Sequence, residues 1–168
     1  MSSPDEVVNK IIETLQADAT LNGVGTWSAV NGVVPGKSLS ITAGCDGEDY
    51  EPYTQDKDQC TARITVYIAL DNRSLPSAER KPGEERLAQG DRAIRRLAHI
   101  VRASLVENRK LGGVINDSFP RKVEYLATED LADLHIAAIH LDADFFVERS
   151  RPKSVPTVAQ IVLDVKPA

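Results

Sequence analysis

Residues 82–108 constrain the fold most, because they have the pattern of one long amphipathic helix. Their apolar side chains recur at steps of three and four residues, which places them on one stripe. The stripe consists of Leu87, Ile94, Leu97, Ala98, Val101 and Leu105. Glu84 and Glu85 fall in the expected first turn, where the helix dipole favours negative charge, and glycines break the helix at residues 111–113. A helix of about 25 residues spans roughly 38 Å, which is long enough to lie across a whole sheet.

The side of this helix opposite the apolar stripe is basic. It carries Arg92, Arg95, Arg96 and Arg102, which we expect on a single face. Such a stripe is usually solvated, but it can also meet carboxylates of a neighbouring subunit. These four arginines are therefore the candidate subunit-interface residues.

The other elements predict an α+β fold. Ser3, Pro4 and Glu6 form a capping box at the start of a first helix, which should end before Asn22. The apolar stripe of this helix is Val7, Val8, Ile11, Ile12 and Leu15. Alternating apolar and polar side chains predict strands. These strands are residues 39–43, 59–71, 121–128 and 134–148, the last two joined by a bend at Glu129 and Asp130. We expect an antiparallel or mixed sheet of four to five strands with two helices packed on one face.

The length of 168 residues fits a single α+β domain, which we place at residues 1–149. Residues 150–168 are expected to form an extended C-terminal arm, because Pro152 and Pro156 lie in a linker before a short alternating stretch. The apolar positions of the arm are Ile161, Leu163 and Val165. Such a strand can return to its own sheet or add to the sheet edge of a neighbour.

The composition excludes several classes of protein. A formal net charge of -5 argues against a protein that coats nucleic acid. No apolar run approaches the roughly 18 residues that a membrane span needs, so we expect no membrane partner. The N-terminus lacks the basic region and apolar core of a signal peptide. Cys45 and Cys60 are therefore expected to be reduced thiols.

Residues 46–58 combine six carboxylates with one lysine, and we expect them to form an acidic loop. They lack the ligand spacing and the terminal glutamate of a calcium-binding EF-hand loop. Two interpretations stay open: a solvated loop, or a loop that faces a partner and orders on assembly. The acidic residues considered for such a contact are Asp46, Glu48, Asp49 and Glu51.

A second acidic group lies on the last predicted strand. His140, Asp142 and Asp144 share one face of it, and His135 lies on the other. Because the three are spread over roughly 13 Å of strand, one ion cannot touch them all. We expect a solvated acidic face, with no metal and no cofactor. The sequence has no glycine-rich phosphate loop, nucleophile elbow or paired cysteine–histidine set. We therefore expect no enzyme; the competing interpretation is a metal-dependent enzyme or small-ligand binder.

The layout resembles the tail terminator, or tail completion, proteins of long-tailed bacteriophages. The resemblance covers residues 3–148 and rests on the pattern and order of elements, without a signature motif. It is carried by Val7 to Leu15, Cys60 to Leu70, Leu87 to Leu105, Leu111-Gly112-Gly113, Val123 to Ala127 and Ile136 to Val147. It implies a non-enzymatic subunit, without a cofactor, of a hexameric ring on top of the tail tube. Such a ring stops tube polymerisation and gives the head connector a docking surface.

The resemblance also implies a place in the virion, at the head–tail junction, after synthesis in the host cytoplasm. The partners would be further copies, the tail tube protein and the head connector or neck protein. DNA would pass through without specific binding, because a lumen lined by carboxylates such as Asp142 and Asp144, or those of residues 46–58, repels phosphate. A basic stripe and an acidic loop on different surfaces suit a head-to-tail contact, which closes rings. The acidic loop and the arm depart from the family pattern, which leaves another phage neck or connector subunit as the alternative.

Overall fold

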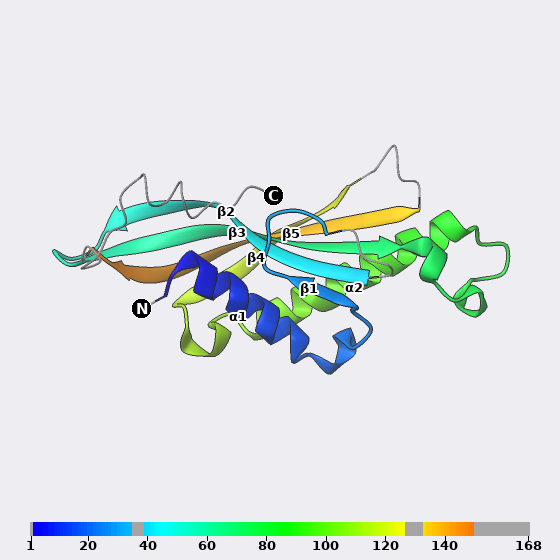
Figure 1. Ribbon diagram of the computed structural model, residues 1–168, viewed down its shortest axis with the longest axis horizontal. Helices are drawn as coiled ribbons and strands as arrows, with labels where there is room; N and C mark the ends of the chain where they lie inside the picture. Colours follow the sequence, from blue (N-terminus) through cyan, green and yellow to red (C-terminus); the bar gives the residue numbers. More distant parts are fainter. Residues whose placement is uncertain (1, 35–38, 127–132, 150–168) are drawn as a thin grey trace, which may run out of the picture.

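The computed structural model describes residues 2–34, 39–126 and 133–149, and it shows an α+β fold (Figure 1). Two helices pack on a five-stranded mixed sheet. The helices are α1 (Pro4–Gln16) and α2 (Arg86–Glu107). The strands are β1 (Thr26–Ser28), β2 (Leu39–Pro52), β3 (Lys57–Asp71), β4 (Asp117–Leu126) and β5 (Leu134–Glu148). Short 3₁₀ turns cover Ala19–Leu21, Asn72–Ser74, Ser77–Glu79 and Leu111–Gly113.

The strand order in the sheet is β1-β2-β3-β5-β4. The short strand β1 runs parallel to β2, and all other pairs are antiparallel. Both helices lie on the same side of the sheet, α1 against β2 and α2 across β3, β5 and β4 (Figure 1). The prediction of a four- to five-stranded sheet with two helices on one face is confirmed.

The core lies between this helical layer and the sheet. The apolar stripe of α1 is fully formed: its five side chains are at most 8% exposed. The first turn has the predicted capping box, in which Ser3 accepts from the Glu6 N–H at 3.3 Å and donates its own N–H to the Glu6 carboxylate at 2.9 Å. Alternate residues of β3 and β5 complete the core, including Cys60, which is fully buried.

Helix α2 is shorter than predicted, because it begins at Arg86 and does not include Glu84 and Glu85 in its first turn. Glu85 is the N-cap residue, and Glu84 lies outside the helix. The Glu84 carboxylate instead accepts hydrogen bonds from the Lys81 N–H at 2.8 Å and from Arg92 at 3.0 Å, which holds the preceding turn. The expectation that Leu87 joins the apolar stripe is also wrong, since Leu87 is 54% exposed.

The predicted acidic loop at residues 46–58 is wrong as well. This stretch continues β2 to Pro52 and begins β3 at Lys57, so that the two strands form one long hairpin. A bulge between Cys45 and Gly47 shifts the register, and pairing then runs to Pro52 opposite Asp58. Backbone pairing and the cross-strand partners of the acidic side chains stabilise this hairpin, although its sequence alternates only weakly between apolar and polar residues.

The last two strands agree with the predicted closing pair. β5 has the predicted bounds, whereas β4 begins four residues earlier than expected, at Asp117. The bend at Glu129 and Asp130 and the C-terminal arm, including Ile161, Leu163 and Val165, lie outside the described residues. Neither helix in the described part of the chain is long and apolar enough to cross a membrane.

Candidate assembly surfaces

Helix α2 and the edge strand β4 together form a surface on which arginines lie over exposed aromatic rings. The guanidinium carbon of Arg95 is 5.9 Å from the ring centroid of Tyr125. Those of Arg102 and Arg109 are 5.8 and 5.5 Å from the ring centroid of Phe119. These distances suit cation–π contacts, yet Phe119 and Tyr125 remain 45% and 44% exposed. We call these five residues the basic edge; it is cationic and apolar at once, which suits an acidic partner.

Polar contacts between the residues that follow α2 and the start of β4 fix the part of the basic edge around Phe119. The Arg109 Nε donates to Asp117 Oδ1 at 2.8 Å, and this hydrogen bond holds the pKa of Asp117 below its ordinary value. The Ser118 hydroxyl donates to the Arg109 carbonyl at 2.8 Å. The side chain of Arg109 is therefore held in place over Phe119 before any partner binds.

The predicted single face of four arginines divides into two rows. Arg95 and Arg102 lie seven residues apart and face β4, whereas Arg92 and Arg96 lie about a quarter turn away. Arg92 is held by Glu84, with Nε and Oε1 3.0 Å apart, and by the Glu79 carbonyl at 3.0 Å. Arg92 and Arg96 also line a groove of about 240 Å³ beside the turn that precedes α2. The prediction placed these residues correctly on the surface but not on one face.

The acidic residues at the other side of the sheet lie on the β2–β3 hairpin, which we call the acidic hairpin (residues 46–58). Asp46 accepts from the Thr65 hydroxyl, and Asp49 forms an ion pair with Arg63 at 2.6 Å. Glu48 accepts from the Tyr50 hydroxyl, which raises the pKa of Tyr50. All four candidate acids of this stretch are exposed to solvent.

The face of the sheet turned away from the helices carries a network of polar side chains. The Thr65 hydroxyl contacts His140 Nδ1 at 3.1 Å, and His140 Nε2 contacts Glu124 at 2.9 Å. Hydrogen bonds from Lys122 and then His140 lower the pKa of Glu124. With the Asp46–Thr65 bond, the network connects β2, β3, β5 and β4 in sequence.

The prediction that His140, Asp142 and Asp144 share one face of β5 is confirmed, because all three lie on the side away from the core. They are half-buried there and not fully solvated as expected. Asp142 forms an ion pair with Arg121 at 3.1 Å, and Asp144 accepts from the Thr61 hydroxyl at 2.6 Å. Within the described ranges, no group of three or more histidine, cysteine, aspartate or glutamate side chains is placed to hold a metal ion.

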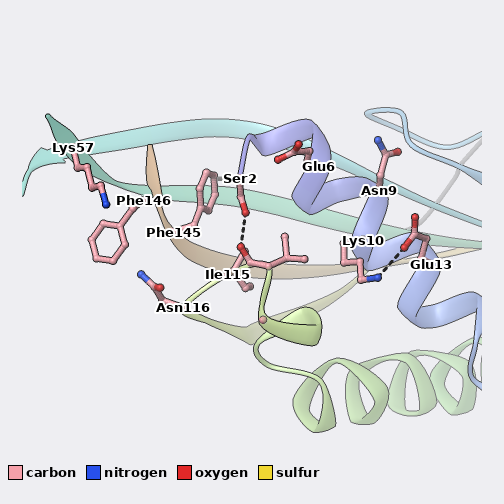
Figure 2. A pocket seen from close by; sticks show the side chains of 12 residues that line it. Ser2, Glu6, Asn9, Lys10, Glu13, Lys57, Ile115, Asn116, Phe145 and Phe146 are labelled. Atoms are coloured by element: carbon pink, nitrogen blue, oxygen red, sulfur yellow. Dashed lines mark hydrogen bonds and ion pairs between the residues drawn. The ribbon is translucent and has the colours of Figure 1, made fainter. Parts of the chain in front are cut away.

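A hollow of about 660 Å³ lies beneath the acidic hairpin, between the start of α1 and the end of β5 (Figure 2). Its walls mix charged and aromatic side chains, with the Lys10–Glu13 ion pair at 3.0 Å on one side and Phe146 on the other. Phe146 also contacts Tyr53 of the hairpin, with ring centroids 4.6 Å apart. The hollow is wide and its charges are of both signs, which gives it no clear preference for one small ligand.

No pattern in the sequence predicts the aromatic half of the basic edge. Phe119 and Tyr125 belong to the second predicted hairpin or its approach, and nothing in their local pattern shows that they are exposed. Their exposure follows from the position of β4 at the edge of the sheet. Arg109 lies two residues beyond the end of α2 at Glu107, and it donates a hydrogen bond to Asp117 of β4.

The chain matches no protein-family model, and it has no significant similarity to any curated protein.

Proposed function

We propose that this chain is a structural subunit that assembles head to tail into a ring, and that the ring ends a bacteriophage tail tube. The observation that carries the proposal is the separation of two unlike surfaces. The basic edge lies on α2 and β4, and the acidic hairpin lies on β2 and β3, at the opposite side of the sheet. A contact between two unlike surfaces is heterologous, and copies that repeat it by a closing rotation form a ring.

The tail assignment is supported by the order of elements, which follows the pattern of tail terminator proteins. An N-terminal helix precedes a strand pair, a long helix, a glycine break and a closing strand pair. In this proposal the two faces of the ring contact the tail tube protein and the head connector. The carboxylates of Asp142 and Asp144 are candidates to line the lumen, where negative charge would let DNA pass without binding.

The ring is tested by the molar mass of the purified chain in solution. We expect a hexamer, measured by light scattering after size exclusion, and its loss in the double variant Arg95→Glu with Arg102→Glu. The matched control is Arg86→Glu with Arg96→Glu, which changes the net charge equally on the same helix but away from β4. Circular dichroism should show that both variants are folded. A monomeric wild type at all concentrations, or full assembly of the Arg95→Glu, Arg102→Glu variant, would contradict the proposal.

The place of the ring is tested by adding the purified chain to a bacteriophage tail tube protein as it polymerises. A terminator added during polymerisation should shorten the tubes in electron micrographs and appear at one end only. A ring that leaves tube length unchanged but binds the head connector would identify a neck subunit instead.

A further inference from the structure

Two strand edges of the sheet are free of strand partners within the described residues. On one side, β1 pairs only with Ser40–Thr42 of β2, so the stretch 47–52 of β2 has no strand beside it. On the other side, β4 is the last strand along its whole length. Free edges expose backbone N–H and C=O groups that can pair with another chain.

The exposed apolar side chains gather at these two edges. Seven large apolar side chains in the described part of the chain are more than 40% exposed, and five of them are near one edge or the other. These five are Tyr50 and Tyr53 on the acidic hairpin and Phe119, Tyr125 and Leu126 on β4. An exposed apolar side chain beside a free strand edge is typical of a surface that becomes buried on association.

The charges of the two edges are opposite. Glu48, Asp49 and Glu51 lie along the free stretch of β2. Arg121 and Lys122 lie on β4, where they form ion pairs with Asp142 and Glu124 of the same subunit. The arginines of the basic edge lie beside them and add further positive charge. Pairing two β4 edges would bring cations together, and pairing two β2 edges would bring carboxylates together. Electrostatic complementarity therefore favours β4 of one copy against β2 of another.

We propose that β4 of one copy pairs with residues 47–52 of β2 in the next, so that the sheet continues across the subunit boundary. This inference rests on the proposed ring and names the strands that form its contact. Since β2 and β5 run in the same direction and β4 runs opposite to both, copies related by an axis along the strands pair antiparallel.

The register of the sheet predicts how the copies are staggered. Lys122 pairs with His140, which pairs with Thr65, and Thr65 pairs with Gly44. Lys122 therefore lies at the same height along the strands as Gly44. The free stretch of β2 is centred near Asp49. The next copy must therefore shift by about five residues, or roughly 17 Å, along the strands. Closed sheets require such a stagger, because their strands tilt relative to the axis of closure.

The side chains of the two edges match on both faces of such a sheet. Tyr50 lies opposite Cys60 and Tyr125 opposite Ala137, so both tyrosines belong to the helical side. Glu51 and Lys122 belong to the other side, opposite Gln59 and His140. Aromatic side chains would thus meet on one face, and acidic and basic side chains on the other.

Disulfide trapping between differently tagged copies tests the proposed pairing. One copy carries Asp49→Cys or Glu51→Cys, which together cover neighbouring registers, and the other carries Lys122→Cys. After mild oxidation we expect a cross-linked dimer of the two tagged copies as the main product. A matched control replaces the first copy by Glu13→Cys, an exposed position on α1, and should give no cross-linked dimer. Wild-type protein, with Cys60 buried and Cys45 half-buried, controls for the natural thiols.

The outcomes separate this inference from the proposed ring. A ring of the expected mass without these cross-links would overturn the strand pairing and leave the ring standing. A cross-link from Leu163→Cys to Lys122→Cys in place of the β2 cross-link would show that the C-terminal arm occupies the β4 edge, which also overturns the pairing. A monomer at all concentrations would overturn both proposals.

Discussion

Replacing Gly90 by alanine tests how closely α2 packs on the end of the sheet. Gly90 faces His135 of β5 and Asn72 of the turn after β3, which are 9% and 2% exposed. A Cβ atom at residue 90 would lie 2.6 Å from His135 Cδ2 and 2.8 Å from Asn72 Cβ. Real Cβ contacts are not this short, so the helix or the imidazole ring must move.

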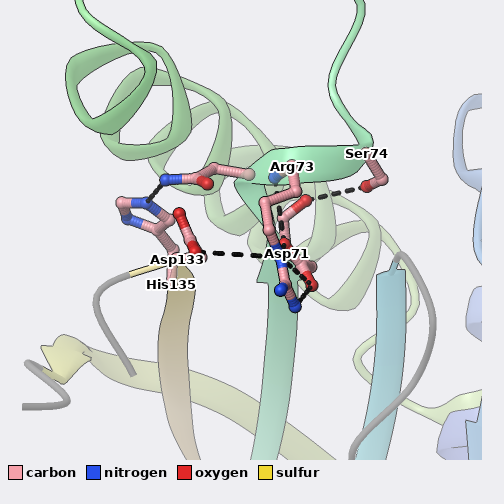
Figure 3. A network of polar contacts seen from close by, with 6 residues as sticks. Asp71, Arg73, Ser74, Asp133 and His135 are labelled. Carbon is pink, nitrogen blue, oxygen red and sulfur yellow. Dashed lines mark hydrogen bonds and ion pairs between the residues drawn. The ribbon is translucent and has the colours of Figure 1, made fainter. Parts of the chain in front are cut away.

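The same movement disturbs a buried polar pair. Asn72 Nδ2 and His135 Nε2 are 3.1 Å apart, and His135 Nδ1 is 4.0 Å from Asp91 Oδ1. If Nε2 accepts from the amide, the imidazole proton lies on Nδ1, towards Asp91. Figure 3 shows His135 near the Asp71–Arg73 ion pair that closes the turn after β3. Pushing His135 away would leave buried polar groups without partners.

The expected cost is the sum of three effects. Overpacking costs about 1–3 kcal/mol, and leaving a buried hydrogen-bonding group without a partner costs about 1–3 kcal/mol. Alanine in place of glycine inside a helix stabilises the folded state by about 1 kcal/mol. The free energy of unfolding should therefore fall by about 1–5 kcal/mol, which for a chain of this size lowers Tm by about 2–4 °C per kcal/mol.

Urea unfolding followed by circular dichroism, at fixed protein concentration, measures this change. Gly23→Ala is the control, because a Cβ atom there would meet nothing within 4 Å and the backbone is not left-handed. It should change stability by less than about 0.5 kcal/mol. Gly90→Ala should also cost less in a His135→Ala background, where the ring is gone. A Gly90→Ala protein as stable as the wild type would refute the reasoning.

Three further predictions concern groups outside this contact. Ser3→Ala removes the capping hydrogen bond to the Glu6 N–H and should lower stability by about 1 kcal/mol in thermal unfolding. Burial raises the pKa of Cys60 to about 11. The contribution of the protonated thiol to stability is therefore complete below pH 9 and should be lost between pH 9 and 11. Alkylation of this thiol should require opening of the fold. The hydrogen bond from Arg92 lowers the pKa of Glu84 to about 2. The contribution of the Glu84–Arg92 pair to folding stability should therefore persist above pH 4.5 and disappear as the pH falls towards 2. An NMR titration should show the Glu84 midpoint return towards its ordinary value in Arg92→Ala.

Local patterns were sufficient to predict the parts of the fold that depend on near neighbours in the chain. The capping box at Ser3 fixes the start of α1, and steps of three and four residues fix its buried side. Alternation likewise predicts that His140 and Asp142 lie on the outer face of β5. These features follow from backbone geometry, which the order of side chains is enough to reveal.

The same reasoning failed where the outcome depended on distant residues. Residues 46–58 look like a loop because their side chains are acidic on both faces, yet pairing with β3 and contacts to Arg63 and Thr65 hold them in a strand. The start of α2 was misplaced for a similar reason, since Glu84 binds Arg92 and not the helix end.

The sequence alone determined both helices, the strands whose side chains alternate and most of the residues that each one buries, because periodicity is a property of the local chain. Only the tertiary structure decided which strands are edges, and hence that Phe119 and Tyr125 are exposed beside arginines of α2. Strand order is set by pairing between residues far apart in the chain, so no local pattern contains it.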